Sequence, residues 1–289
     1  MRWPTLLAVL AVVACTEPVP EPTAISFDLG TYYAATEAEI RATGGMRTDY
    51  APADAPFSKA DLARDFMRIA LFDEYQAVDG RYVAGETPSN LRRFDRPIRV
   101  RVVNGDDTPT PDARFNSDAV AQYTRRLAEV TGHDIRLAST GERANMVVFF
   151  MNREELPRVA YQLGRYVTAP PREVEHAFAN SPIDLLCGAF SLSNERSPDS
   201  YRSSVILIKS EHSIAQRNAC VHEEMAQALG LTNDSRAARP SIFNDDEEFA
   251  TLTKHDEMLL RILYDPRLHS GMTSGEVRPI LSTIINEIW

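Results

Sequence analysis

VHEEMAQALGLTND, residues 221–234, is the most specific pattern in this 289-residue chain and decides which fold we expect. Its apolar spacing predicts the end of a helix over about 213–229, and Gly230 stops that helix. Glu223 and Gln227 are four residues apart, so their side chains lie on the same helix face. The stretch therefore predicts a helix with polar groups on one face, followed by a glycine turn.

The spacing is similar to that of a zinc-protease helix, although no histidine occupies a ligand position. In the pattern H-E-x-x-H, two histidines bind zinc from one helix face and the glutamate acts as general base. His222 does not fit, because Ala226 lies four residues after it. The longer metzincin pattern H-E-x-x-H-x-x-G-x-x-H fits when it is aligned on Gly230. That alignment places Glu223, Gln227 and Asn233 at the ligand positions and Glu224 at the base position.

Two further segments extend the resemblance to metzincins over roughly residues 98–268. SIFND, residues 241–245, resembles the segment that carries the metzincin Met-turn, with Phe243 in place of methionine. LTKHDEMLLRILYDPRL, residues 252–268, resembles the helix that closes such domains. Together with Cys220, these motifs also resemble a family of bacterial lipoproteins built on a domain of unknown function. That resemblance implies that Glu223, Gln227 and Asn233 are characteristic of the family.

These residue types suit a hard cation better than zinc. A carboxylate and two amides offer only oxygen ligands, so we expect no zinc, whereas calcium is compatible with the set. Asp234 and the acidic run after Phe243 are possible additional ligands. Two alternatives stay open: a metal-free polar cluster in which Glu223 or Glu224 accepts hydrogen bonds from the amides, and a Glu224 that is an ordinary exposed helix residue.

The remaining pattern predicts an α+β fold, in which a mixed sheet backed by helices precedes a helical C-terminal half. By resemblance this is a metzincin or zincin-like fold, and residues 58–289 form a single domain. Ser58 and Asp61 have capping-box spacing, Thr253 caps a later helix, and Asp79-Gly80 marks a hairpin. The expected strands begin near Ile98, Asp134, Ala144, Leu185 and Ser203, and the expected helices include 116–132, 153–164, 170–181 and 274–288.

The N-terminus predicts export. Residues 1–15 have one cation and a short apolar run, which is typical of a signal peptide. The ending VVAC resembles a bacterial lipobox, so we expect Cys15 to be lipidated; the alternative is a plain signal peptide. Residues 16–57 follow as a Pro-rich tether and irregular segment, with one possible short helix around TEAEIRA. Thr16, a residue other than aspartate, favours anchoring in the outer membrane on its periplasmic side.

Cys187 and Cys220 are the remaining cysteines, and in an oxidising compartment we expect them to form a disulfide. The alternative is two free buried thiols. The formal net charge of −10 argues against nucleic acid as a partner, because its binding needs a basic face.

We therefore expect a binding or scaffolding module at the cell envelope, anchored to the membrane, with an envelope protein or peptide as partner. The alternative is a hydrolase that uses Glu224, either with an oxygen-ligated metal or with no metal.

Overall fold

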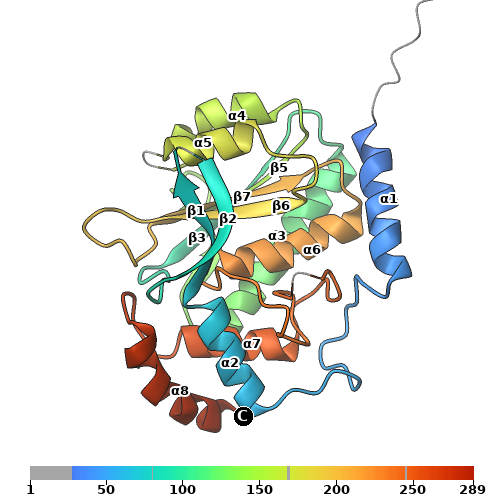
Figure 1. Ribbon diagram of the computed structural model, residues 1–289. Coiled ribbons are helices and arrows are strands. Elements are labelled where there is room, and N and C mark those ends of the chain that lie inside the picture. The colour runs from blue at the N-terminus through green and yellow to red at the C-terminus, as the bar shows by residue number, and fades with distance from the viewer. Residues whose placement is uncertain (1–27, 80, 168–169, 245) are drawn as a thin grey trace, which may run out of the picture.

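The computed structural model describes residues 28–79, 81–167, 170–244 and 246–289, and a five-stranded mixed sheet lies at its centre (Figure 1). The strand order is β4-β3-β5-β7-β6. The first four strands in this order are parallel, whereas the edge strand β6 is antiparallel to β7. The strands are β3 (Ile98–Asn104), β4 (Ile135–Leu137), β5 (Met146–Met151), β6 (Cys187–Leu192) and β7 (Ser203–Lys209).

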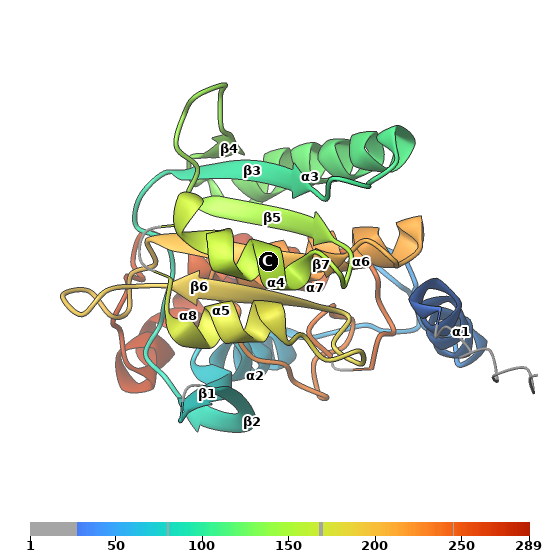
Figure 2. The ribbon, with the colours of Figure 1, turned by 90° about the horizontal axis from the view of Figure 1, so that it is seen from above.

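Helices cover both faces of this sheet (Figures 1 and 2). The apolar run of β5 supplies both cores, because successive side chains of a strand point to opposite faces. Val147 and Phe149 join the core under α4 and α5, while Val148 and Phe150 join the larger core on the opposite face. The helices are α4 (Leu156–Gln162) and α5 (Arg172–Ala179) on one side, and α3 (Thr110–Thr131) and α6 (Ile214–Gln227) on the other; a 3-10 turn, Leu163–Arg165, follows α4.

A helical layer follows below α6 and holds the C-terminal part of the chain (Figure 1). It consists of α2 (Lys59–Ile69), α7 (Lys254–Leu263) and α8 (Ser274–Ile288). Each of these helices begins with a capping box, in which a hydroxyl and an acid satisfy the first backbone N–H groups. The expected caps at Ser58 and Thr253 are therefore present, and the α+β prediction is confirmed.

The hairpin expected at Asp79 forms a separate two-stranded sheet of β1 (Phe72–Val78) and β2 (Arg81–Pro88). It lies in front of β6 in Figure 1 and beside it in Figure 2. The ring of Tyr82 contacts that of Phe190 on β6, with 5.5 Å between the ring centres. The hairpin thus forms a wall next to the edge of the main sheet.

Two segments differ from the expectation. Helix α3 starts at Thr110, well before the expected position at 116. Pro111 lies in its first turn, where backbone N–H groups have no partner within the helix, so proline fits there although it has no N–H group. The segment before residue 58 contains α1 (Leu29–Ala42), which is longer than the short helix expected there. This segment also packs on the domain, since Met46 is buried and Arg47 pairs with Phe249 in a β-bridge.

Residues 1–15, for which we expect a signal peptide and a lipidated Cys15, lie outside the described residues. Within the part of the chain that the structure describes, no helix is long and apolar enough to cross a membrane.

A buried histidine joins α2 to α7. His255 is fully buried, and its Nε2 lies 3.1 Å from the carboxylate of Asp65 on α2. Its Nδ1 lies 3.7 Å from Asp256. Burial lowers the pKa of His255, but the attraction of its ring to the carboxylates of Asp256 and Asp65 outweighs burial and raises the pKa to about 8. His255 is therefore a cation that pairs with two carboxylates in the folded protein.

This raised pKa predicts a loss of stability in mild alkali. The contribution of His255 is fully present below pH 6.5 and is lost as the pH rises from about 6.5 through 8. The unfolding free energy should fall by at most about 2 kcal/mol, because each unit of pKa difference corresponds to about 1.4 kcal/mol. Urea denaturation at pH 6, 7 and 8 measures it.

The comparison variant is His255→Gln, which should lack this part of the pH dependence, whereas His269→Gln, at an exposed loop position, should keep it. Parallel pH profiles for wild type and His255→Gln would contradict the assignment.

Candidate functional site: an acidic cleft beside the motif helix

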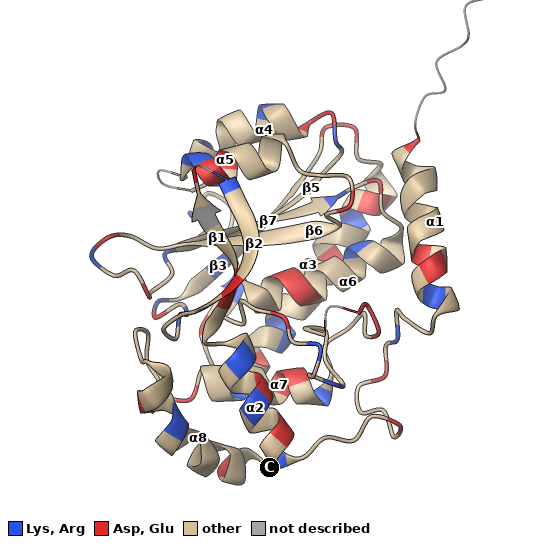
Figure 3. Ribbon diagram, viewed as in Figure 1, with Lys and Arg blue, Asp and Glu red and all other residues tan. Residues whose placement is uncertain are grey.

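A cleft of about 990 Å³ lies between α6, β6 and the β1–β2 hairpin. Its size is at the upper end of the range for small-ligand sites. Tyr75 and Tyr82 of the hairpin and Phe190 of β6 line its walls. Its floor carries carboxylates from α6, from β1 and from the loops after α6, which we call the acidic floor: Glu74, Glu223, Glu224, Asp234 and Glu247. Figure 3 shows the acidic segments of α6 and of β1 close to one another.

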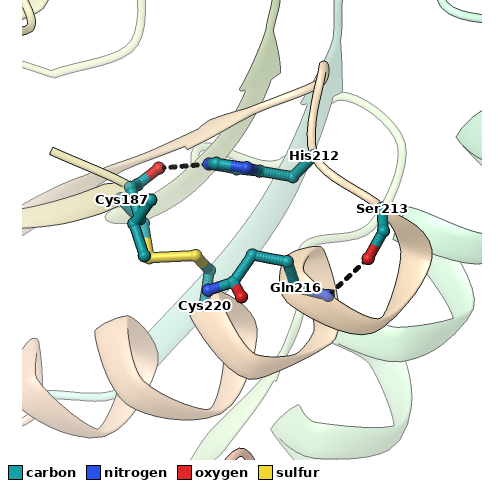
Figure 4. Close-up of a disulfide and its surroundings, with 6 residues drawn as sticks. Cys187, His212, Ser213, Gln216 and Cys220 are labelled. Carbon is teal, nitrogen blue, oxygen red and sulfur yellow. Dashed lines mark hydrogen bonds between the residues drawn. A yellow bond between two sulfur atoms is a disulfide. The ribbon is translucent and has the colours of Figure 1, made fainter. Parts of the chain in front are cut away.

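Three contacts fix β6 on α6 at this cleft, and we call them the β6–α6 contacts. The first is the disulfide between Cys187 and Cys220, which confirms the expected pairing (Figure 4). In the second, Glu224 accepts a hydrogen bond from the backbone N–H of Ala189. In the third, the Ser191 hydroxyl donates to the carbonyl of Ala228, at 3.1 Å.

The spacing of these contacts follows from the geometry of a strand and a helix. From one contact to the next, the position advances by two residues along β6 and by four residues along α6. Two strand residues span about 6.8 Å and four helix residues about 6 Å, so the two repeats nearly match. The edge strand and the motif helix are thereby held side by side along the length of the cleft.

Glu223 and Glu224 face strong electrostatic repulsion. Burial is the main reason why the pKa of both carboxyls lies well above the usual range. The second reason is charge repulsion, from Glu224 on Glu223 and from Asp234 on Glu224. Glu224 is only 4% exposed. Among the described residues, none donates a hydrogen bond to its Oε2 atom. Glu224 is thus not the exposed helix residue of the simpler interpretation, since one side of its carboxyl bonds β6 and the other is buried at the cleft.

Of the three residues at the metzincin ligand positions, two share the cleft and one does not. Glu223 and Gln227 both line it, one helix turn apart. Asn233 points away, because its amide Nδ2 donates to the carbonyl of Arg68 at 3.1 Å and to Glu86 at 3.2 Å. The next residue, Asp234, lines the cleft instead.

Gly230 explains how the chain turns at this point. Its φ is +129°, a conformation that side chains rarely adopt. A Cβ atom there would also lie 2.0 Å from the carbonyl oxygen of Arg92. Glycine is therefore required for the backbone approach that brings Thr232 and Asp234 back to the cleft.

The SIFND segment supports the cleft from below. The Ser241 hydroxyl donates to Asp256 at 2.5 Å, and the backbone N–H of Phe243 donates to the Ser241 oxygen at 3.0 Å. Phe243 is fully buried. Asn244 and Glu247 then line the cleft, whereas Asp245 lies outside the described residues.

Among the described residues, the ligand atoms that cluster at the cleft include no imidazole and no free thiolate. His176 also lines the cleft but lies outside this cluster. Cys187 lies close to Glu223 and Glu224, with ligand atoms within 4.8 Å of one another, but its sulfur is in the disulfide. His222 points elsewhere: its Nδ1 accepts from the backbone N–H of Leu252, and burial lowers its pKa to about 4. Carboxylate and amide oxygens are what remains, and these suit hard cations.

Sequence reasoning missed Glu74, which comes from the hairpin far earlier in the chain. No motif links it to residues 221–234. No local signal singled it out, because Asp73 and Glu74 directly follow the apolar run of helical spacing that begins after Ser58.

Comparison with known proteins gives a family and no activity. A family model described as a protein of unknown function, DUF2927, matches residues 59–283. No curated protein and no solved structure matches the chain. The expectation of a family of unknown function is confirmed, and the match includes every residue of the acidic floor.

The disulfide should contribute strongly to stability, because it closes a loop over a sequence separation of 33. The double variant Cys187→Ala/Cys220→Ala should lower the unfolding free energy by roughly 3 to 4 kcal/mol in the chain-entropy model. Urea denaturation with and without dithiothreitol measures this. Reduction should lower the stability of the wild type to that of the double variant and leave the variant unchanged. Equal stability of oxidised and reduced wild type would contradict the prediction.

Proposed function

The chain belongs to the DUF2927 family, and we propose that it is a non-catalytic binding module whose cleft holds an extended, positively charged segment of an envelope protein or peptide. The acidic floor, in an open cleft of about 990 Å³, is the observation that carries this proposal.

The chemistry of the cleft supports a cationic ligand. Five carboxylates meet on the floor, and repulsion among them contributes to the raised pKa values of Glu223 and Glu224. A positive group on a ligand would relieve that repulsion, whereas a phosphate or a nucleotide would increase it. Arg81 and Arg92 also line the cleft, but Arg92 is paired with Asp73.

The walls support an extended ligand with apolar side chains. Tyr75 and Tyr82 are 44% and 37% exposed, and both line the cleft. The ring of Tyr82 contacts Phe190, so these aromatic residues offer an apolar surface beside the charged floor.

We further propose that the frame is zincin-like and has lost its catalytic use. Gly230, the shared face of Glu223 and Gln227, and the buried Phe243 support this relationship. Two contacts argue against catalysis of the metzincin kind. Asn233 is bonded to α2 and the hairpin and does not reach the cleft, and one side of the Glu224 carboxyl is bonded to the backbone of β6, which leaves only its Oε2 for a water molecule.

A hydrolase that uses Glu224 is the second candidate. Its raised pKa and the neighbouring Glu223 are the observations that favour it, since a buried carboxyl with a raised pKa can hold and transfer a proton.

For the location, we propose an exported protein anchored by a lipid on Cys15, on the periplasmic side of the outer membrane. The lipobox-like VVAC before the Pro-rich segment supports this. The cleft would then be held near the membrane surface, within reach of other envelope components.

Binding should depend on the sign of charge of the peptide. We expect a fluorescent peptide that alternates lysine and leucine to bind the full-length protein in detergent, and the glutamate-for-lysine analogue not to bind. The variant Glu74→Gln/Glu247→Gln should weaken the lysine peptide at least tenfold, because two charges leave the acidic floor. Fluorescence polarisation at fixed ionic strength measures both.

The matched control is Asp118→Asn/Glu195→Gln, which removes two exposed carboxylates outside the cleft and should leave the affinity unchanged. Equal loss in both double variants would mean non-specific attraction and would overturn the proposal. Mass spectrometry of the same mixtures tests the second candidate: peptide cleavage by wild type that Glu224→Gln abolishes would establish the hydrolase in place of the binding module.

The anchor has an independent test. Mass spectrometry of the mature protein from a bacterial host should find Cys15 as an acylated first residue. Cys15→Ser should remain unprocessed and carry no lipid. A mature chain that starts elsewhere, without acylation, would disprove the anchor.

A further inference from the structure

We propose that Glu223 and Glu224 bind one calcium ion on the acidic floor of the cleft. This inference concerns the floor itself and does not require that a peptide binds above it.

The first observation is the geometry of the two carboxylates. Ligand oxygens of Glu223 and Glu224 lie within 4.8 Å of each other. Calcium binds its oxygen ligands at about 2.3–2.6 Å, so two oxygens on one ion are separated by at most about 5 Å. One ion between the two side chains therefore fits without a movement of the backbone.

The second observation is independent of the charge cluster. Glu224 is 4% exposed and lines the cleft, and none of the described residues donates to its Oε2 atom. A buried carboxylate oxygen without a partner is costly, and native structures rarely keep one without an ion, a water molecule or a proton. The other side of this carboxyl bonds Ala189, so the orientation of Glu224 toward the floor is fixed.

The cleft holds further oxygen groups, which lie outside the cluster of ligand atoms within 4.8 Å of one another and would have to approach a bound ion. Glu74, Asp234 and Glu247 all act electrostatically on both Glu223 and Glu224, and Gln227 lines the same cleft one turn further along α6. Calcium takes six to eight oxygens in irregular arrangements, whereas magnesium requires a near-ideal octahedron. Ligands drawn from a helix, a hairpin and two loops meet the looser requirement more readily.

The same donor set selects against zinc. The imidazole of His222 points away, His176 lines the cleft outside the cluster of ligand atoms, and both sulfurs near the floor are in the disulfide. Five carboxylates also carry more negative charge than one divalent ion neutralises. The cleft therefore remains acidic with the ion bound, and the peptide proposed above is still attracted.

Isothermal titration of CaCl₂ into the full-length protein in detergent, stripped with EDTA, tests this. We expect one calcium ion per chain, weaker binding of magnesium, and no displacement of calcium by an equal concentration of zinc. Glu224→Gln and Glu223→Gln should each weaken calcium binding at least tenfold. Either variant suffices if the other fails to fold, as judged by circular dichroism. Glu195→Gln removes one exposed carboxylate outside the cleft and should bind calcium as the wild type does.

Three results would overturn the proposal: no heat with calcium up to millimolar concentration, unchanged affinity in the Glu223 and Glu224 variants, or tighter binding of zinc than of calcium. Polarisation with the lysine peptide, with and without calcium, separates the two proposals. Calcium binding without peptide binding removes the proposed function and leaves the ion site standing.

Discussion

The β6–α6 contacts are the constraint on which the rest of the structure depends. They join the edge of the sheet to the motif helix by a disulfide, a carboxylate bonded to a backbone N–H, and a hydroxyl bonded to a carbonyl. Because the repeats of strand and helix nearly match, all three form at once. Without them, the cleft would lose one wall and Glu224 would lose its orientation.

The same constraint separates this cleft from a working zinc-protease site. In such a site the glutamate after the first ligand acts on water beside the metal. Here Glu224 bonds the backbone of β6. Glu223, directly before it, is a carboxylate, and Gln227, one helix turn after it, is an amide. The arrangement favours holding a positive charge over activating a nucleophile, which is why a cationic ligand and an oxygen-bound ion are the functions that we propose.

The fold could be predicted in large part, because its signals are local. Alternating apolar residues in β3, the continuous apolar run of β5, the capping boxes at Ser58 and Thr253, and the hairpin at Asp79 each act within a few residues. The start of α3 could not, because the proline in its first turn gave a weaker signal than the later Asn116 and Ser117. Packing of residues before 58 depends on distant partners such as Phe249, which no local pattern reveals.

By itself, the sequence predicted the motif helix and its glycine turn from their spacing, and it predicted the pairing of Cys187 with Cys220 from the expected export to an oxidising compartment. Only the tertiary structure decided which polar residues meet. It turned Asn233 toward α2, brought Asp234 to the cleft in its place, and added Glu74 from the hairpin. There are two physical reasons. After the glycine turn, neighbouring residues point in opposite directions, so a shift by one residue decides which side chain faces the cleft. Contacts between segments that are far apart in the chain have no fixed sequence spacing, so no motif reveals them.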